Sequence, residues 1–166
     1  LPPGISRDRI APNNGEEIRA RKRRELGLAD DEIVLLMVGS GFIKKGLNRG
    51  LYALRSLPKG IRERTKLFVI GEDNPAPFQR VVLALGLRKQ VTILSGRDDV
   101  PEFLLASDVL LHPALDENAG IILLEAIVAG LPVLATDICG WGHYVTEANV
   151  GCLIESPFKQ VALNEK

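Results

Sequence analysis

The sequence has few cysteines, few aromatic residues and no excess of charge, and each shortage argues against a class of protein. Its two cysteines, Cys139 and Cys152, belong to no CxxC or Cys/His cluster, which argues against a disulfide scaffold or a zinc site. Aromatic residues make up 5% of the chain, too few for a base-stacking platform. The 21 basic and 21 acidic residues give a formal net charge of 0, so bulk charge gives no support for nucleic-acid binding.

Long apolar runs are also missing, since none reaches the roughly 20 residues that a membrane-spanning helix needs. The 166 residues are instead 46% hydrophobic and 25% charged, a composition typical of one soluble globular domain with a substantial core. The chain begins with Leu1 rather than Met. We therefore expect it to be a portion of a longer protein.

Short apolar runs alternate with helical patterns along the chain. The runs predict strands over residues 33–39, 67–71, 91–94, 109–112, 132–136 and 150–154. The other patterns predict a loop over 1–14, a turn over 73–77, and helices over 16–26, 47–57, 78–85, 100–106 and 118–129, with shorter ones from 140 and 157. Such alternation predicts an α/β fold with a doubly wound parallel sheet of about six strands. Ligands of such sheets bind at the carboxyl ends of the strands.

The first predicted helix is basic and amphipathic. Ile18 and Leu26 face inward, and five basic side chains between residues 19 and 24 face mostly outward. We interpret the basic side as a solvated helix face. Contact with a membrane surface or acidic lipid is the alternative.

Two carboxylates mark the predicted helix over residues 118–129. This helix is apolar nearly all round, so we expect it to be buried. Glu125 lies within it, and a buried carboxylate needs a cation, backbone donors or ligand hydroxyls as partners. Glu117 precedes the helix, in a loop that a ligand could reach. The backbone N–H groups of Ala119, Gly120 and Ile121 would face an anion at the helix N-terminus.

This combination is what a phosphorylated sugar requires, because it offers an anion site beside acceptors for hydroxyl protons. A structural ion pair between Glu125 and a core Arg or Lys is the alternative.

A glycine-containing loop over residues 39–46 follows the first predicted strand. A dinucleotide fingerprint would need glycine where Lys44 stands, and a Walker A loop would need lysine where Leu47 stands. Both motifs are therefore absent, which disfavours a dinucleotide-binding or flavodoxin-like domain. Gly41 would let the backbone approach a ligand closely. Lys44 and Lys45 could neutralise a pyrophosphate, or they could be solvated lysines of a turn.

Taken together, two motifs resemble a known family. The spacing Glu117-x7-Glu125 and the loop 39–46 with its Lys-Gly ending resemble the signature of the family 4 retaining glycosyltransferases of GT-B fold. The stretches 95–100, 110–114, 129–134 and 139–144 narrow the resemblance to the bacterial lipopolysaccharide core glucosyltransferases.

The resemblance covers nearly the whole chain. It implies that residues 1–166 are the C-terminal, nucleotide-sugar-binding domain of such an enzyme, one Rossmann-like half of a GT-B fold. The opening residues 1–5 are similar to the point where these enzymes enter that domain. The N-terminal acceptor domain and the final C-terminal helix would then lie outside this sequence.

The resemblance also implies roles for individual residues. Lys45, together with Arg9 of the opening loop, would bind the diphosphate and stabilise the departing nucleoside diphosphate, and Lys44 would assist. Glu117 would hold hydroxyls of the donor sugar, and Glu125 those of the ribose. Lys45 and Glu117 are the predicted catalytic residues.

Backbone groups are expected to complete the site. Those from Ala119 to Ile121, Gly120 included, would contact sugar and phosphate, and backbone near Arg97 would meet the uracil. His112 and His143 are interpreted as packing or hydrogen-bonding residues. Trp141 either lines the mouth of a pocket or packs.

The implied activity is retaining transfer of glucose from UDP-glucose to a heptose of the lipopolysaccharide inner core. The implied partners are the UDP-sugar donor and an acceptor bound through the missing N-terminal domain, without nucleic acid. No DxD motif is present, and no metal or other cofactor is expected. The resemblance implies a cytoplasmic protein, and it suggests peripheral contact with the inner face of the cytoplasmic membrane.

This chain alone is expected to bind donor without catalysing transfer. The alternatives are a GT-B enzyme with another nucleotide sugar or acceptor, and a non-catalytic nucleotide-binding module.

Overall fold

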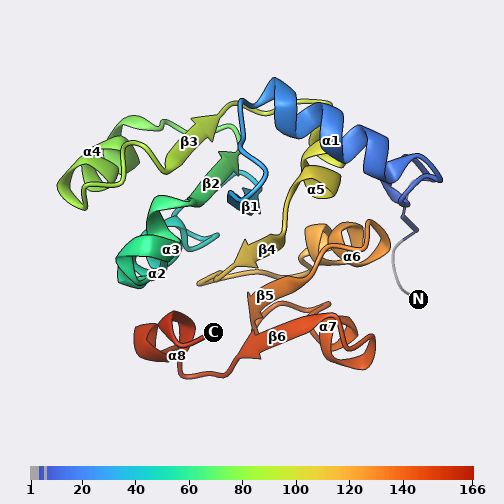
Figure 1. Cartoon of the computed structure of the whole chain (residues 1–166). Coiled ribbons are helices and arrows are strands. Elements are labelled where there is room, and N and C mark those ends of the chain that lie inside the picture. The colour runs from blue at the N-terminus through green and yellow to red at the C-terminus, as the bar shows by residue number, and fades with distance from the viewer. Residues whose placement is uncertain (1–3, 6) are drawn as a thin grey trace.

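The chain folds into an open sheet of six parallel strands with helices on both faces (Figure 1). The computed structural model describes residues 4, 5 and 7–166, so residues 1–3 of the predicted opening motif lie outside it. The strands are β1 (Ile33–Val38), β2 (Thr65–Ile70), β3 (Val91–Leu94), β4 (Val109–His112), β5 (Val133–Thr136) and β6 (Gly151–Ile154). Their parallel pairing confirms the predicted doubly wound α/β class.

The strand order β3-β2-β1-β4-β5-β6 changes direction between β1 and β4. The chain leads from β1 outward to β2 and β3, and then crosses back to place β4 on the other side of β1. Leu35 and Leu36 of β1 lie beside Val109 and Leu110 of β4. Connections that leave two such strands in opposite directions open a crevice at their carboxyl ends. The two predicted site loops follow β1 and β4, and they therefore meet at this switch point.

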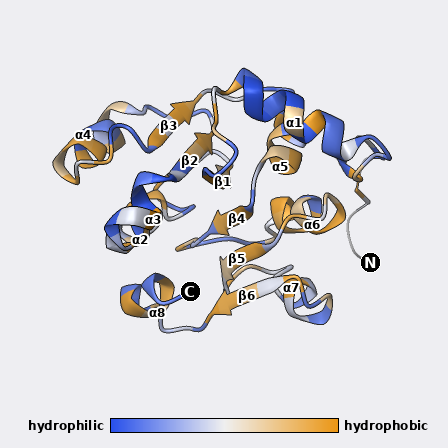
Figure 2. Ribbon diagram, viewed as in Figure 1, coloured by the Kyte–Doolittle hydropathy of each residue, from blue (hydrophilic) through white to orange (hydrophobic). Residues whose placement is uncertain are grey.

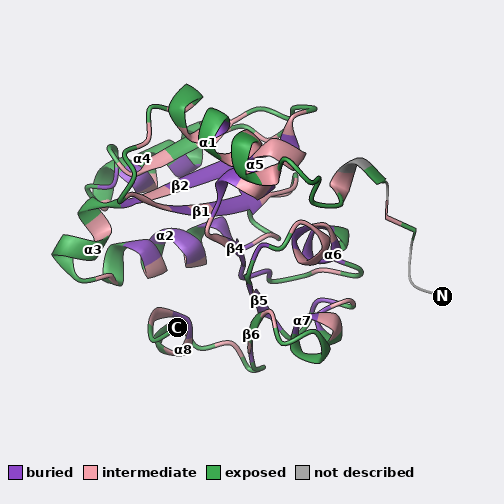
Figure 3. Cartoon of the chain, turned by 45° about the vertical axis from the view of Figure 1, so that its right-hand side comes forward, coloured by how far each residue is buried: buried purple, intermediate pink, exposed green. Residues whose placement is uncertain are grey.

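Helices cover the sheet in two layers, each with its own core. They are α1 (Gly15–Glu25), α2 (Leu47–Ser56), α3 (Lys59–Glu63), α4 (Ala76–Ala84), α5 (Val100–Ala106), α6 (Ile121–Val128), α7 (His143–Glu147) and α8 (Gln160–Asn164), preceded by a 3-10 turn, η1 (Arg7–Arg9). Leu36 of β1 faces the core shared with α5, α6 and α7, and Met37 faces the core shared with α2, α4 and α8. Figures 2 and 3 show the inner strands β1, β2, β4 and β5 as the apolar, buried centre. Of the described helices, none has the length and apolar character of a membrane span.

Ion pairs bind helix α1 to the rest of the fold. Lys22 is 5% exposed, and its Nζ lies 2.6 Å from Asp99 Oδ2. Arg19 and Arg23 both contact the carboxylate of Asp108, just before β4. The prediction that this basic cluster forms a solvated face is therefore wrong for Lys22 and Arg23. Their partners Asp99 and Asp108 lie more than 75 positions later in the chain, where local periodicity could not reveal them.

Some element boundaries also differ from the prediction. Helix α6 begins at Ile121 rather than near residue 118, because Gly120 has a left-handed φ of 76° and ends the preceding turn. Helix α4 begins at Ala76, within the predicted turn over 73–77. The short helix α3 was not predicted, and η1 lies in the predicted opening loop. None of these shifts moves a strand away from the candidate site.

Candidate functional site

The loops after β1 and β4 contact each other directly at the switch point. The backbone N–H of Leu115 donates to the carbonyl of Lys44 at 2.7 Å. Arg49, in the helix α2 that follows the first loop, donates from Nη1 to the carbonyl of Ala114 at 2.7 Å. Gly46 has a φ of 76°, and a Cβ there would lie 2.0 Å from the carbonyl oxygen of Pro113. Only glycine therefore permits this approach of the two loops.

Asp73 fixes the glycine loop from the neighbouring strand end. Its Oδ2 accepts the backbone N–H groups of Gly41 and Phe42 at 2.6 and 3.3 Å. Phe42 is 1% exposed and anchors the loop in the core beneath α2 and α4. From the sequence, Asp73 is expected only to be part of the turn over 73–77. Its position shortly after β2, at the edge of the sheet that carries the glycine loop, is the signal that could have indicated this contact.

Glu117 is held by two side chains that reach the same oxygen. Lys45 Nζ forms an ion pair with Glu117 Oε2, and His112 Nε2 lies 3.1 Å from that atom. His112 is the last residue of β4 and is 1% exposed. The side chain of Glu117 is 11% exposed. The carboxylate is thus fixed between the core and the glycine loop.

The same contacts keep Glu117 ionised. The hydrogen bond from His112 and the interaction with Lys45 lower the pKa of Glu117 to about 2, although burial acts in the opposite direction. At neutral pH this side chain is a hydrogen-bond acceptor. It can receive hydroxyl protons in hydrogen bonds and has none of its own to donate.

The start of helix α6 is held by the loop after β5. The backbone N–H of Trp141 donates to the carbonyl of Ala119 at 2.9 Å. A Cβ on Gly140 would lie 2.2 Å from the carbonyl oxygen of Asn118, so this loop packs backbone to backbone against the segment before α6. That packing fixes the direction in which the first N–H groups of α6 point.

Glu125 meets a cation, as its position in an apolar helix required. Arg9 Nε lies 3.6 Å from Glu125 Oε1, and the glutamate side chain is 17% exposed. The sequence left a cation, backbone donors or ligand hydroxyls as the possible partner, and the structure supplies a cation. Glu125 also borders the cavity described next, so its carboxylate is within reach of a ligand there. The contact predicted between Arg9 and a diphosphate stays a prediction.

A cavity of about 260 Å³ brings most of the predicted site residues together. It is lined by Val38, Gly39, Lys45, Glu117, Ala119, Gly120, Ile121, Ile122 and Glu125. One ammonium, two carboxylates and the N-terminal turn of α6 therefore border a single space. A positive helix end beside a lysine favours an anion, and the carboxylates provide acceptors for hydroxyl groups.

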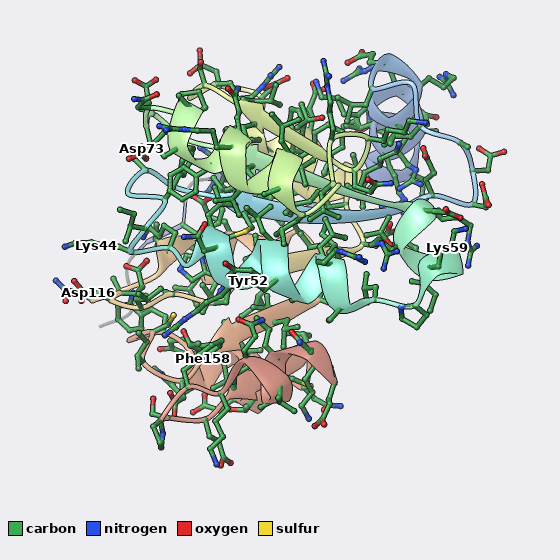
Figure 4. The ribbon with its side chains drawn as sticks, turned by 90° about the vertical axis from the view of Figure 1, so that its left-hand side faces the viewer. Lys44, Tyr52, Lys59, Asp73, Asp116 and Phe158 are labelled. Carbon is green, nitrogen blue, oxygen red and sulfur yellow. The ribbon has the colours of Figure 1, made fainter. Side chains whose placement is uncertain are left out.

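Two predicted site residues of the glycine loop lie outside this cavity lining. Lys44 and Asp116 are both exposed and pair at 3.2 Å at the edge of the molecule (Figure 4). Gly41 gives its backbone N–H to Asp73. The structure thus distinguishes Lys45, which lines the cavity, from its neighbour Lys44, which does not.

Arg97 lies apart from the cavity lining, after the end of β3. Its guanidinium forms an ion pair with Asp99 and lies 4.8 Å from the ring centre of Phe103. Arg97 and then Lys22 hold the pKa of Asp99 well below its usual range. This network fixes the loop after β3, where the predicted backbone contact with uracil would be made.

The two other residues without an assigned role are Trp141, on the loop after β5, and His143, the first residue of α7. His143 is exposed, with its Nδ1 3.2 Å from the carbonyl oxygen of Gly140, and its ring lies 6.2 Å from that of Trp141. Neither residue belongs to the cavity lining. Within residues 4, 5 and 7–166, no three His, Cys, Asp or Glu side chains are grouped as candidate metal ligands.

Comparison with known proteins agrees with the resemblance drawn from the motifs. Residues 18–166 match the family described as "Glycosyl transferases group 1". The chain is 48% identical over 165 residues to the lipopolysaccharide glucosyltransferase WaaG of Escherichia coli, covering 99% of this chain and 44% of that protein. The crystal structure of WaaG superposes with a TM-score of 0.94 at 49% identity, over 99% of this chain and 45% of that one.

A more distant structure shares the fold. Anabaena Alr3699/HepE in complex with UDP-glucose superposes with a TM-score of 0.83 at 22% identity, over 98% of this chain and 44% of that chain. The present chain thus spans less than half the length of the proteins it matches. The match over residues 18–166, together with the confirmed sheet topology, shows that the chain belongs to the group 1 glycosyl transferase family.

Proposed function

We propose that this chain is the donor-binding half of a retaining glucosyltransferase. In this proposal the enzyme transfers glucose from UDP-glucose to a heptose of the lipopolysaccharide inner core. The name of the E. coli relative supports glucose as the transferred sugar and lipopolysaccharide as the product. The UDP-glucose complex of a protein with the same fold supports UDP as the nucleotide of the donor. The observation that carries the proposal is the joint placement of Lys45, Glu117, Glu125 and the start of α6 around one cavity.

Each part of the donor would meet a group of matching chemistry. The diphosphate would lie between Lys45 and the N-terminus of α6, where both the ammonium and the helix dipole favour negative charge. The hydroxyls of the glucose would donate to Glu117, and those of the ribose to Glu125. The loop after β3, fixed by Arg97 and its ion pair, would border the base.

The proposed chemistry is stabilisation of a leaving group. As the bond between the sugar and the diphosphate breaks, negative charge grows on the diphosphate oxygens. A preorganised cation or N–H donor at such a position contributes roughly 3–4 kcal/mol to catalysis. We assign this task to Lys45 and the first N–H groups of α6, and propose that no metal ion is required. Glu117 holds the sugar and is not assigned a covalent intermediate.

A second domain would be needed to complete the reaction. The cavity of about 260 Å³ is smaller than the roughly 300–1,000 Å³ of sites that enclose a small ligand. The matched proteins are more than twice as long as this chain. We therefore propose that an N-terminal domain supplies the other wall and the acceptor site, and that this chain alone binds donor weakly.

We also propose a cytoplasmic location for the reaction. Peripheral contact with the inner membrane face stays a prediction. Helix α1 gives little support for membrane contact, because Arg19, Lys22 and Arg23 form ion pairs with carboxylates of the same chain.

Calorimetric titration of UDP and UDP-glucose tests the proposal. We expect both to bind, and expect Lys45→Ala and Glu125→Ala to weaken binding about tenfold or more, as loss of a charge-assisted contact predicts. Lys59→Ala and Glu63→Ala are matched controls, because both side chains are exposed on α3. Replacing Mg²⁺ with a chelator should leave the affinities unchanged.

Equal weakening by the controls would contradict the proposed site. If the chain alone fails to bind at millimolar UDP, the same four substitutions in the full-length protein decide the question. No response of its UDP affinity to Lys45→Ala or Glu125→Ala would overturn the proposal.

A further inference from the structure

His112 is a buried imidazole whose contact leads out of the core and into the candidate site. It ends β4 and is 1% exposed, and its Nε2 lies 3.1 Å from Glu117 Oε2. An ionised carboxylate accepts hydrogen bonds and donates none, so the contact requires that Nε2 carry the proton. The loop after β4 returns over the strand end and places Glu117 against this donor.

The two partners of Glu117 share one of its oxygens. Lys45 Nζ and His112 Nε2 both meet Oε2, and neither contact uses Oε1. Glu117 borders the cavity. The carboxylate is therefore held at Oε2, and Oε1 can accept hydrogen bonds from sugar hydroxyls.

The two partners differ in how freely they can move. Lys45 is carried on the glycine loop by a flexible side chain that is 23% exposed, whereas His112 is enclosed at the end of a central strand. A bound diphosphate would compete with Glu117 for the single ammonium of Lys45. A buried carboxylate that loses its donors is destabilised and reorients.

We propose that His112 is the positioning residue that keeps Glu117 directed at the donor sugar while Lys45 serves the diphosphate. The inference rests on the proposed function and assigns a further residue to the same site. It predicts that His112 affects recognition of the sugar and leaves recognition of UDP nearly unchanged, because UDP makes no use of Glu117.

Two substitutions separate positioning from packing. In His112→Gln the side-chain amide can place an N–H near the position of Nε2. His112→Met has a similar length and offers no donor. We expect His112→Met to weaken UDP-glucose binding about fivefold to tenfold, the effect of one hydrogen bond to a charged group, with UDP affinity changed less than twofold. His112→Gln should recover most of the loss.

Two further variants serve as a control and as a double-mutant comparison. His143→Met replaces an exposed histidine whose Nδ1 lies near the carbonyl of Gly140 rather than near Glu117, and we expect it to leave both affinities unchanged. In a Glu117→Ala background, which removes the acceptor of the hydrogen bond, His112→Met should add little to the loss of UDP-glucose affinity, since contacting residues are not additive.

Nitrogen chemical shifts of the wild-type histidine rings give an independent test that needs no variant. We expect Nε2 of His112 to carry a proton both in the free protein and with UDP bound. A proton on Nδ1 alone would overturn the inference. Equal weakening of UDP and UDP-glucose by His112→Met, or no recovery in His112→Gln, would overturn it as well. Each of these outcomes would overturn the inference about His112 without contradicting the proposed function. Absence of UDP binding by the wild-type full-length protein would overturn both the inference and the proposed function.

Discussion

Lys45 and Glu117 form an ion pair that joins the loop after β1 to the loop after β4. The two residues are 72 positions apart, and the strand order brings them together at the switch point. Both belong to the cavity lining. In the proposed reaction each has a separate target, the diphosphate for Lys45 and the sugar for Glu117. Their contact therefore links recognition of the two halves of the donor.

Neighbouring lysines of the glycine loop should differ in their effect on nucleotide binding. Lys45→Ala should weaken UDP binding about tenfold or more, because it removes the cation at the cavity. Lys44→Ala should change the affinity less than threefold, since Lys44 points to Asp116 at the surface and exposed ion pairs contribute little. Calorimetry on the two variants measures both values. Equal losses would show that Lys44 also reaches the ligand.

The low pKa of Glu117 predicts a pH-dependent contribution to stability. A carboxyl whose pKa falls from 4.5 to about 2 on folding stabilises the protein above pH 4.5 and loses this effect as the pH falls toward 2. The contribution is roughly 3 kcal/mol as an upper figure. We expect Glu117→Gln to be destabilised at pH 7 and the difference from wild type to narrow below pH 4. Urea unfolding at pH 7, 4 and 3 tests this, and a difference independent of pH would contradict it.

The network around Asp99 should stabilise the docking of α1. Asp99→Asn weakens the contacts to Lys22 and Arg97 together and leaves a buried ammonium with weaker partners. We expect a loss of about 1–2 kcal/mol in the free energy of unfolding, discounted for the partial exposure of Asp99. Arg24→Ala, at an exposed position of the same helix, is the control, and should cost less than about 0.5 kcal/mol. Comparable losses in the two variants would argue against the network.

Gly46 should tolerate no side chain. In Gly46→Ala the new Cβ would clash with the carbonyl of Pro113 at a left-handed backbone position, which we expect to cost about 2–4 kcal/mol and to weaken UDP binding. Gly60→Ala is the matched control, since Gly60 lies in helix α3 with nothing within 4 Å of an added Cβ. It should be neutral or stabilising by up to about 1 kcal/mol. Thermal melts and UDP titration of both variants decide this prediction.

The isolated chain should not transfer glucose. The proposed function assigns the other wall of the cavity and the acceptor site to a second domain, so in this chain alone neither acceptor positioning nor exclusion of water would be complete. We expect no transfer from UDP-glucose to a lipopolysaccharide acceptor above the uncatalysed rate, and transfer once the N-terminal half is present. Measurable transfer by the 166 residues alone would show that the acceptor site lies within them.

The sheet and most of the site could be predicted from local pattern. Apolar runs locate the six described strands, and the positions of Lys45 and Glu117 in the loops that follow two of them place both at one edge of the sheet. Long-range contacts could not be predicted in this way. Local pattern treats Lys44 and Lys45 alike, and only the family resemblance singles out Lys45. The folded loop directs Lys45 to the cavity and Lys44 to Asp116. The role of His112 depends on a loop that returns five residues later to meet its own strand.

The candidate site is built from segments that are anchored in both hydrophobic cores of the protein. The glycine loop is anchored through Phe42 in the core on one face of the sheet, and α6 through Ile122 and Leu123 in the core on the other. A donor bound between Lys45 and α6 would therefore connect the two layers through the crevice. Hydrogen exchange should report this connection, because amides in helices on opposite faces would slow together when nucleotide binds. A small molecule at the edge of the sheet would then act as a cross-link for the whole domain.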